Sequence, residues 1–240
     1  CRKNLSELTT ADFASYRDEQ LKTVSAKSLQ RMLSPIRRMF RVAADEWDLP
    51  VSNPLDRLRL KVVDNKRQRR LLAGELDRLI AAAKSTKNPY TLLVVRFALE
   101  TGMRRGEILA LNWREVDLQR LSVSVLEAKN GHSRVIPLSS RAVAILQEAR
   151  RLQDDQSASV FPMSANGFRL SWERLVKRAN ITGLHFHDLR HEAISRLFEY
   201  GLTAPEVASV SGHRDMRMLF RYAHANQTTV REKMSALDRV

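Results

Sequence analysis

Two histidines open and close the short stretch "HDLRH" at residues 187–191. On a helix, positions four apart share one face, and metalloproteases use the same spacing for zinc in H-E-x-x-H. Here Asp188 replaces the glutamate base, no third ligand is evident, and Arg190 falls on the face of His187, where it repels a dication. The stretch therefore favours an anion site, in which His187 and Arg190 donate hydrogen bonds to a phosphate. A buried structural histidine pair is the alternative.

Three other segments carry residues suited to phosphate chemistry. "TGMR" (101–104) places Arg104 just after a glycine that ends a helix, and Lys129 stands directly before the hairpin-turn signal Asn130-Gly131. "GH" at 212–213 is followed by Tyr222, nine positions after His213. Taken singly, each is typical of a loop arginine, an exposed turn lysine or a core tyrosine.

The order and spacing of these motifs resemble the tyrosine recombinase (phage integrase) family. That family reads T-G-x-R, then a lysine before a β-hairpin turn, then H-x-x-R, then G-H, then a tyrosine nine residues after that histidine. The matching stretches here are "TGMR", "AKNG", "HDLR", "GH" and Tyr222. The combination is highly specific, and the resemblance spans the whole chain.

The resemblance implies a role for each matched residue. Tyr222 is expected to attack the scissile phosphodiester, while Arg104, Arg190 and His213 bind its non-bridging oxygens. His187 is expected to assist in moving the tyrosine proton, and Lys129 to protonate the leaving 5′ oxygen. These residue types suit the task, because a phosphodiester is already anionic and a phenol with a pKa of about 10 needs cations or a base to react. A phosphotyrosine link conserves bond energy, so no metal, ATP or other cofactor is expected.

Neighbouring residues fit the same pattern with some departures. Glu107 is expected to buttress the region of Arg104, and His191 to pack around the site. The resemblance also exposes differences: Ser211 stands where leucine commonly precedes Gly-His, Glu192 replaces a common threonine, and Leu219 stands where threonine is frequent. None removes a reacting group, so activity is expected with altered packing near the tyrosine.

Composition points to a polyanionic partner. The chain has 240 residues, is 43% hydrophobic and carries a net charge of +14 with 41 Lys+Arg against 27 Asp+Glu. The basic residues are spread along the chain, which favours nucleic acid over a membrane surface. A single cysteine, Cys1, and the lack of a signal peptide or membrane span favour a reducing cytoplasm. Because the chain does not begin with Met, we expect it to be a fragment.

Periodicity predicts a mainly α fold with a small β-hairpin or sheet (α+β). An apolar stripe predicts a helix over 25–47, which Pro35 kinks or divides, and the pattern over 49–70 indicates an interdomain linker. Alternating apolar residues predict a hairpin over 120–138. Further helices are predicted over 9–21, 72–84, 89–102, 139–152, 167–180, 187–200, 204–210 and 226–238. The resemblance implies a helical, SAM-like core-binding domain over 1–64, truncated at its N-terminus, and a catalytic domain over 65–240 with a C-terminal tail helix.

Two other functions remain open. A type IB topoisomerase uses the same chemistry on one strand at a time. A non-enzymatic regulator is suggested by the helix-turn-helix pattern of "PEVASVSGHRDMRMLFRYAH", but it leaves Arg104, Lys129 and the His187–Arg190 pair unexplained. For a recombinase, the expected partners are double-stranded DNA, a homotetramer on paired sites and accessory DNA-bending proteins. The C-terminal segment "TTVREKMSALDRV" (228–240) is expected to dock on a neighbouring protomer in preference to its own core.

Overall fold

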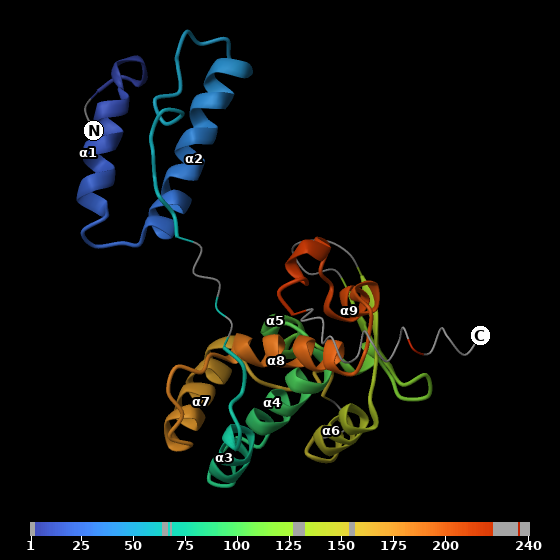
Figure 1. The fold of residues 1–240 in the computed structure, drawn as a ribbon. Helices are drawn as coiled ribbons and strands as arrows, with labels where there is room; N and C mark the ends of the chain where they lie inside the picture. Colours follow the sequence, from blue (N-terminus) through green and yellow to red (C-terminus); the bar gives the residue numbers. More distant parts are fainter. Residues whose placement is uncertain are drawn as a thin grey trace. The chain divides into compact units, whose positions relative to one another are not determined.

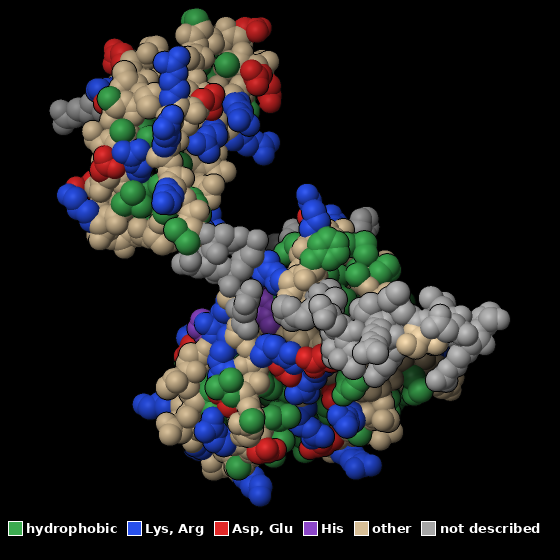
Figure 2. Space-filling model, viewed as in Figure 1, with side chains coloured by type: hydrophobic (Ala, Val, Ile, Leu, Met, Phe, Trp, Pro, Cys, Tyr) green, Lys and Arg blue, Asp and Glu red, His purple; other side chains and the backbone are tan. Residues whose placement is uncertain are grey.

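The computed structural model describes residues 3–63, 67, 69–126, 133–153, 157–222 and 235. The chain divides into two compact units, residues 1–67 and 68–240, each with a hydrophobic cluster of its own. The predicted class is confirmed, since helices dominate both units and one small sheet lies in the second (Figure 1). Lys and Arg side chains are scattered over the visible surface of both units (Figure 2).

The first unit is a helical pair, preceded by a 3₁₀ turn over Leu5–Glu7. Helices α1 (Thr10–Gln20) and α2 (Ala26–Asp45) each begin after a hydroxyl residue that accepts a backbone N–H. Phe13 and Phe40 pack edge to face, with ring centroids 6.3 Å apart. Helix α2 continues past Pro35, so of the two outcomes predicted at that proline, division does not occur.

The stretch after α2 is part of this unit and not a free linker. Leu55 and Leu58 are buried against Leu29 and Leu33 of α2, and Arg37 donates a hydrogen bond to the Leu55 carbonyl at 3.2 Å. The linker prediction is therefore wrong for this part of 49–70. The two leucines lie in a proline-containing run without regular periodicity. For that reason the sequence pattern did not predict that they are buried.

The second unit is built around α4 (Tyr90–Thr101), of which nine of the twelve residues are buried. Helices α6 (Ser140–Arg151) and α8 (Phe186–Glu199) pack directly against it. The remaining elements are α3 (Glu75–Ala83), α5 (Arg105–Leu109), α7 (Ala165–Arg178), α9 (Ala204–Ser211) and the 3₁₀ turns η2 (Trp113–Glu115) and η3 (Met216–Met218). The helices predicted from residue 72 to residue 210 match observed ones to within three residues at each end, whereas the predicted helix over 226–238 lies outside the described residues apart from Ser235.

A three-stranded antiparallel sheet covers one side of this helical core. Strands β1 (Val116–Asp117), β2 (Ser122–Val125) and β3 (Arg134–Pro137) follow one another in order. The pairing of β2 with β3 confirms the strands of the predicted hairpin, and its turn over 127–132 lies outside the described residues. Strand β1 was not predicted, because two residues are too few to show alternation. Helix α9 packs against both β3 and α8, which brings the Gly-His motif at its C-terminal end close to the helix that carries His187 and Arg190.

No described helix has both the length and the apolar character needed to cross a membrane.

Candidate active site

The first motif is positioned by a reversal of the chain at the end of α4. Gly102 adopts a left-handed conformation with φ of 60°, which only glycine takes readily. The chain then enters α5 with Arg104 at its N-cap. Glu107, three residues later, accepts both the backbone N–H and the guanidinium Nη1 of Arg104, each at 2.8 Å. The Glu107 carboxylate therefore fixes the Arg104 side chain at the start of the helix. The sequence predicts this supporting contact for Glu107.

Arg134 holds the same carboxylate from the sheet. Its two Nη atoms donate to Glu107 at 3.1 and 2.8 Å, and its Nε donates to the Val210 carbonyl at 3.0 Å. Burial opposes ionisation of Glu107, but hydrogen bonds from Arg134 and from Arg104 outweigh it and lower its pKa to about 2. Arg134 was not among the predicted site residues. Strand alternation identifies it, because it shares the face of the buried Ile136 two positions later.

Arg190 joins three helices from inside the core. Its side chain is buried on α8 and donates to two backbone carbonyls, those of Gly102 at 2.5 Å and Ser211 at 2.6 Å. These carbonyls lie at the C-terminal ends of α4 and α9, where helix dipoles are negative. Burial and the charge of Arg104 lower the pKa of Arg190 to about 10, so it stays protonated at neutral pH. Because both partners are neutral carbonyls, these hydrogen bonds leave its net charge in place for an anion.

His213 is held in one tautomer by the serine that precedes Gly-His. The Ser211 hydroxyl donates its single proton to the Val207 carbonyl at 2.6 Å, and it lies 2.7 Å from Nδ1 of His213. That nitrogen must therefore carry a proton and donate it to Ser211. Burial, together with the charges of Arg190 and Arg104, lowers the pKa of His213 to about 4. In the neutral ring Nε2 is then the free acceptor.

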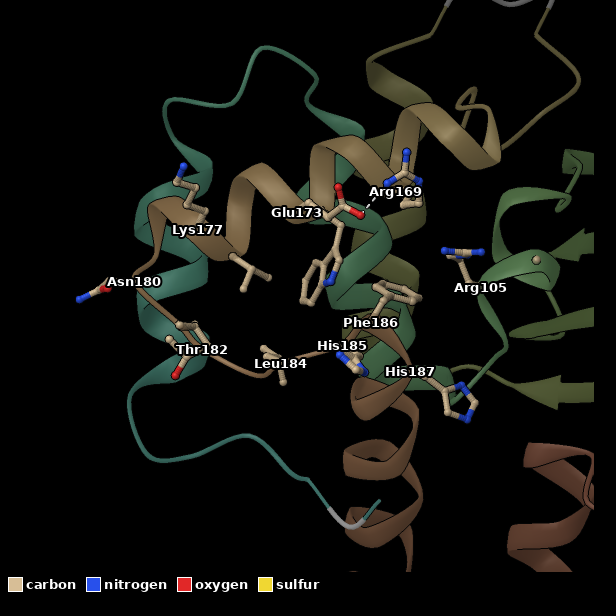
Figure 3. Close-up of a pocket in the computed structure, with 14 residues that line it drawn as sticks. Arg105, Arg169, Glu173, Lys177, Asn180, Thr182, Leu184, His185, Phe186 and His187 are labelled. Carbon is tan, nitrogen blue, oxygen red and sulfur yellow. Dashed lines mark hydrogen bonds and ion pairs between the residues drawn. The ribbon is translucent and has the colours of Figure 1, made fainter. Parts of the chain in front are cut away.

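His187 faces a basic groove beside the motif. The groove encloses about 790 Å³ and includes Arg105, Arg169 and Lys177 in its lining. Figure 3 shows His187 and Arg105 at one end of it, and Lys177 and Asn180 at the other. Burial and the charge of Arg190 lower the pKa of His187.

Tyr222 follows η3 in the chain and reaches back to α8. Its hydroxyl forms a hydrogen bond with Nδ1 of His191, and the two rings stack with centroids 5.6 Å apart. Burial raises the pKa of Tyr222, against the opposing charges of Arg221 and Arg190. Sequence reasoning assigned His191 to packing and missed this contact. The signal was present in the i,i+4 spacing to His187, whose ring meets that of His191 edge to face at 4.9 Å.

Five of the six predicted site residues converge in the described structure. The charge of Arg104 lowers the pKa of His187, Arg190 and His213, and Tyr222 interacts electrostatically with Arg190. Arg104 also donates to the Gly212 carbonyl at 3.4 Å. Lys129 lies within 127–132, outside the described residues. The catalytic roles assigned to all six stay predictions.

The departures from the family pattern have structural partners. Glu192 is buried and forms ion pairs with Arg70 at 2.9 Å and with Arg196 at 2.7 Å. The pair with Arg70 ties the start of the second unit to α8. Leu219 is fully buried and packs with Ile194 of α8 and Val207 of α9, next to Tyr222. Within the described ranges, no cluster of three or more His, Cys, Asp or Glu side chains could hold a metal ion.

Comparison with known proteins places these features in context. The family model described as "Phage integrase family" matches residues 69–229. A shufflon-specific DNA recombinase of Escherichia coli is 40% identical over 98% of this chain, which spans 62% of the length of that relative.

Solved structures share the fold at low identity. The Tn1549 transposon integrase in complex with transposon right end DNA has a TM-score of 0.81 at 19% identity, covering 98% of this chain and 87% of that one. A lambda integrase tetramer bound to a Holliday junction has a TM-score of 0.69 at 20% identity, covering 88% of this chain and 66% of that one.

Proposed function

This chain belongs to the phage integrase family, and on that premise we propose that it is a site-specific DNA recombinase that cuts and rejoins strands through a 3′-phosphotyrosine intermediate. The observation that carries the proposal is the convergence on α8, where the hydroxyl of Tyr222 lies against an imidazole beside the buried guanidinium of Arg190. A phenol, an imidazole and guanidinium groups are the set that phosphodiester attack by tyrosine requires.

The cations form the phosphate-binding part of the proposed site. Three guanidinium groups, those of Arg104, Arg134 and Arg190, surround the single carboxylate of Glu107, so this cluster carries a net charge of two positive units. A scissile phosphate bound there adds negative charge next to His213. That charge favours the imidazolium form, raises its pKa and lets Nε2 donate to a non-bridging oxygen.

Attack and departure follow from this arrangement. The Tyr222 oxygen bonds to phosphorus while the bond from phosphorus to the 5′ oxygen breaks, and the leaving oxygen needs a proton. By resemblance Lys129 supplies that proton. The phosphotyrosine ester keeps the energy of the broken bond, so a 5′-hydroxyl can reverse the step. Neither a metal nor ATP enters the proposed reaction.

The partners and location of the whole protein are part of this proposal. Net charge of +14 and the basic groove at His187 support binding of double-stranded DNA. We propose a homotetramer on paired sites, by analogy with the lambda integrase tetramer bound to a Holliday junction. Assistance by DNA-bending proteins and a cytoplasmic location are expected on the same basis.

Covalent capture tests the proposal directly. The chain is incubated with a pool of duplexes that carry a randomised central segment, and DNA that stays attached to protein in SDS is recovered and sequenced. The wild type should yield SDS-resistant adducts enriched in one sequence. Tyr222→Phe should bind DNA but yield none. The matched control is Tyr200→Phe, since Tyr200 is 75% exposed at the end of α8 and should give adducts as the wild type does.

The same reagents separate the two rival functions. Two copies of the recovered sequence in one plasmid should exchange strands if the chain is a recombinase. Relaxation of the plasmid without exchange would instead identify a topoisomerase. Sequence-specific binding with no adduct from any variant would identify a regulator and refute the proposal.

A further inference from the structure

We infer that His191, in place of His187, accepts the proton of the Tyr222 hydroxyl during attack. The inference rests on the proposed function and sharpens it, because the family resemblance implies this task for His187. It makes His191 a catalytic residue, since its ring touches the reacting oxygen.

The first argument is the path from each imidazole to the phenol. Both histidines project from the same face of α8, one turn apart. His191 is the residue one turn nearer the C-terminus, and its Nδ1 forms the hydrogen bond with the Tyr222 hydroxyl. His187 meets the edge of the His191 ring and borders the basic groove at its other side. Transfer from Tyr222 to His187 would therefore have to pass the intervening ring.

The second argument is that His191 and Tyr222 are held in register by packing. Their rings stack with an interplanar angle of 29°. Leu219, three residues before the tyrosine, is buried against Ile194 of α8. The turn that carries Tyr222 is thus anchored on the helix that carries His191, and the two groups form one unit.

The charges around His191 set when it can act. On α8 they are His187, Asp188 and Arg190, from the tyrosine segment Arg221 and Tyr222, and from the end of α9 His213. Burial and the neighbouring cations lower the pKa of His191 to about 4, so the ring is neutral and Nδ1 can accept a proton.

Proton transfer must accompany bond formation. Burial raises the pKa of Tyr222 and lowers the pKa of His191 to about 4, so in the absence of substrate the proton stays on the phenol. A bound phosphate raises the histidine pKa, and the phenol oxygen becomes acidic as it bonds to phosphorus. The proton then moves to Nδ1 while the 5′ oxygen leaves with a proton from a separate acid. On resealing, His191 returns its proton to the phenol oxygen.

Chemical rescue distinguishes the two histidines. The probe is the duplex recovered by covalent capture, and the readout is the rate of adduct formation in single turnover. His191→Gly should slow adduct formation by about 10²–10³-fold. Added imidazole should then speed adduct formation by this variant at least tenfold. His187→Gly should be slowed without rescue by imidazole. Rescue of His187→Gly alone would overturn the inference.

A conservative variant separates proton transfer from positioning. His191→Gln keeps an amide that can hydrogen-bond the phenol but cannot take its proton. If His191 acts as the base, this variant should be as slow as His191→Gly and should lack the rise of rate with pH that is expected of the wild type. A rate within threefold of wild type would mean that His191 only positions the tyrosine, which refutes the inference.

Folding and function are checked in the same series. Each variant should melt as cooperatively as the wild type and bind the duplex. Because the wild type must form the adduct in every experiment, failure of the proposed function appears as no adduct at all. Failure of this inference appears as an active His191→Gln chain.

Discussion

The two sides of the site are held in different ways. On the cation side, Glu107 joins Arg104 to Arg134, and Arg190 joins the ends of two helices through carbonyls. On the tyrosine side, Tyr222 follows a three-residue 3₁₀ turn in which Met216 and Met218 are exposed, and it reaches the core through Leu219 and His191.

Under the proposed function, this difference distinguishes phosphate binding from strand cleavage. Overlapping ion pairs and buried hydrogen bonds preorganise the cations, so a phosphate meets groups that are already in place. Among the described residues, the segment that carries Tyr222 is held by fewer hydrogen bonds and ion pairs, and its local stability should be lower. Under the proposed function, the phosphate-binding groups are therefore preorganised, and the nucleophile is the less firmly held part of the site.

The largest expected effect comes from Glu107→Ala. The side chain is only 4% exposed and pairs with two arginines, so its removal leaves unpaired buried charge and should lower the free energy of unfolding by about 3–5 kcal/mol. Urea unfolding followed by circular dichroism measures this. The contrasting variant on the tyrosine side is Tyr222→Phe, which should change it by less than about 1 kcal/mol. Equal losses in the two variants would contradict the contrast between the two sides.

A smaller loss of stability is expected from a steric clash at Gly212, the residue before His213. Gly212 has φ of 70°, and a Cβ there would lie 3.0 Å from the Arg134 guanidinium. Gly212→Ala should therefore cost about 2–3 kcal/mol, of which about 1 is backbone strain. Gly183→Ala is the matched control, because Gly183 has φ of 64° but a Cβ there would lie more than 4 Å from other atoms. Thermal melts of both should separate the two contributions, and identical shifts would show that Arg134 yields freely.

We expect the free energy of unfolding to fall in acid, because one histidine on each side of the site becomes protonated. His191 and His213 have pKa values lowered to about 4, below the 6.5 of an unfolded histidine. Between these values the unfolded chain binds more protons, so stability falls as pH drops from about 6.5 toward 4. After allowance for solvent screening, each histidine should contribute about 1 kcal/mol of this loss by pH 5. Unfolding at pH 7 and pH 5 tests it, and the double variant His191→Gln/His213→Gln should lose less than the wild type.

The smallest expected effect concerns Ser211 and the tautomer of His213. Ser211→Ala removes the acceptor of Nδ1–H and should cost about 1 kcal/mol. Nitrogen chemical shifts of the His213 ring should show a mixture of tautomers in this variant and one tautomer in the wild type. Ser211→Thr keeps the hydroxyl and should restore the single tautomer, so an unchanged ring in Ser211→Ala would exclude the serine as its determinant.

Sequence patterns predicted the elements whose periodicity is strong. The apolar stripes of α2 and α6 and the alternation of β2 and β3 follow directly from burial on one face. The sequence did not predict the burial of Leu55 and Leu58 or the two-residue strand β1. Neither segment is long enough to show a repeating pattern of apolar residues.

The site divided along the same line. Motif spacing named Arg104, Arg190, His213 and Tyr222, and all four converge in the described structure. Motif spacing did not predict the ion pair of Arg134 with Glu107 or the contact of His191 with Tyr222. Both join segments distant in the chain, 27 residues apart in the first case and 31 in the second. Only the packing of β3, α8 and the tyrosine segment decides such partners.

The chain order of the site has a consequence for its synthesis. Arg104, Arg190 and His213 all precede Tyr222, so they leave the ribosome before it. Under the proposed function, a nascent chain that has reached residue 213 contains these phosphate-binding groups but still lacks the Tyr222 hydroxyl. Under the proposed function, a translation product that ends before residue 222 lacks the nucleophile and can form no covalent adduct with DNA.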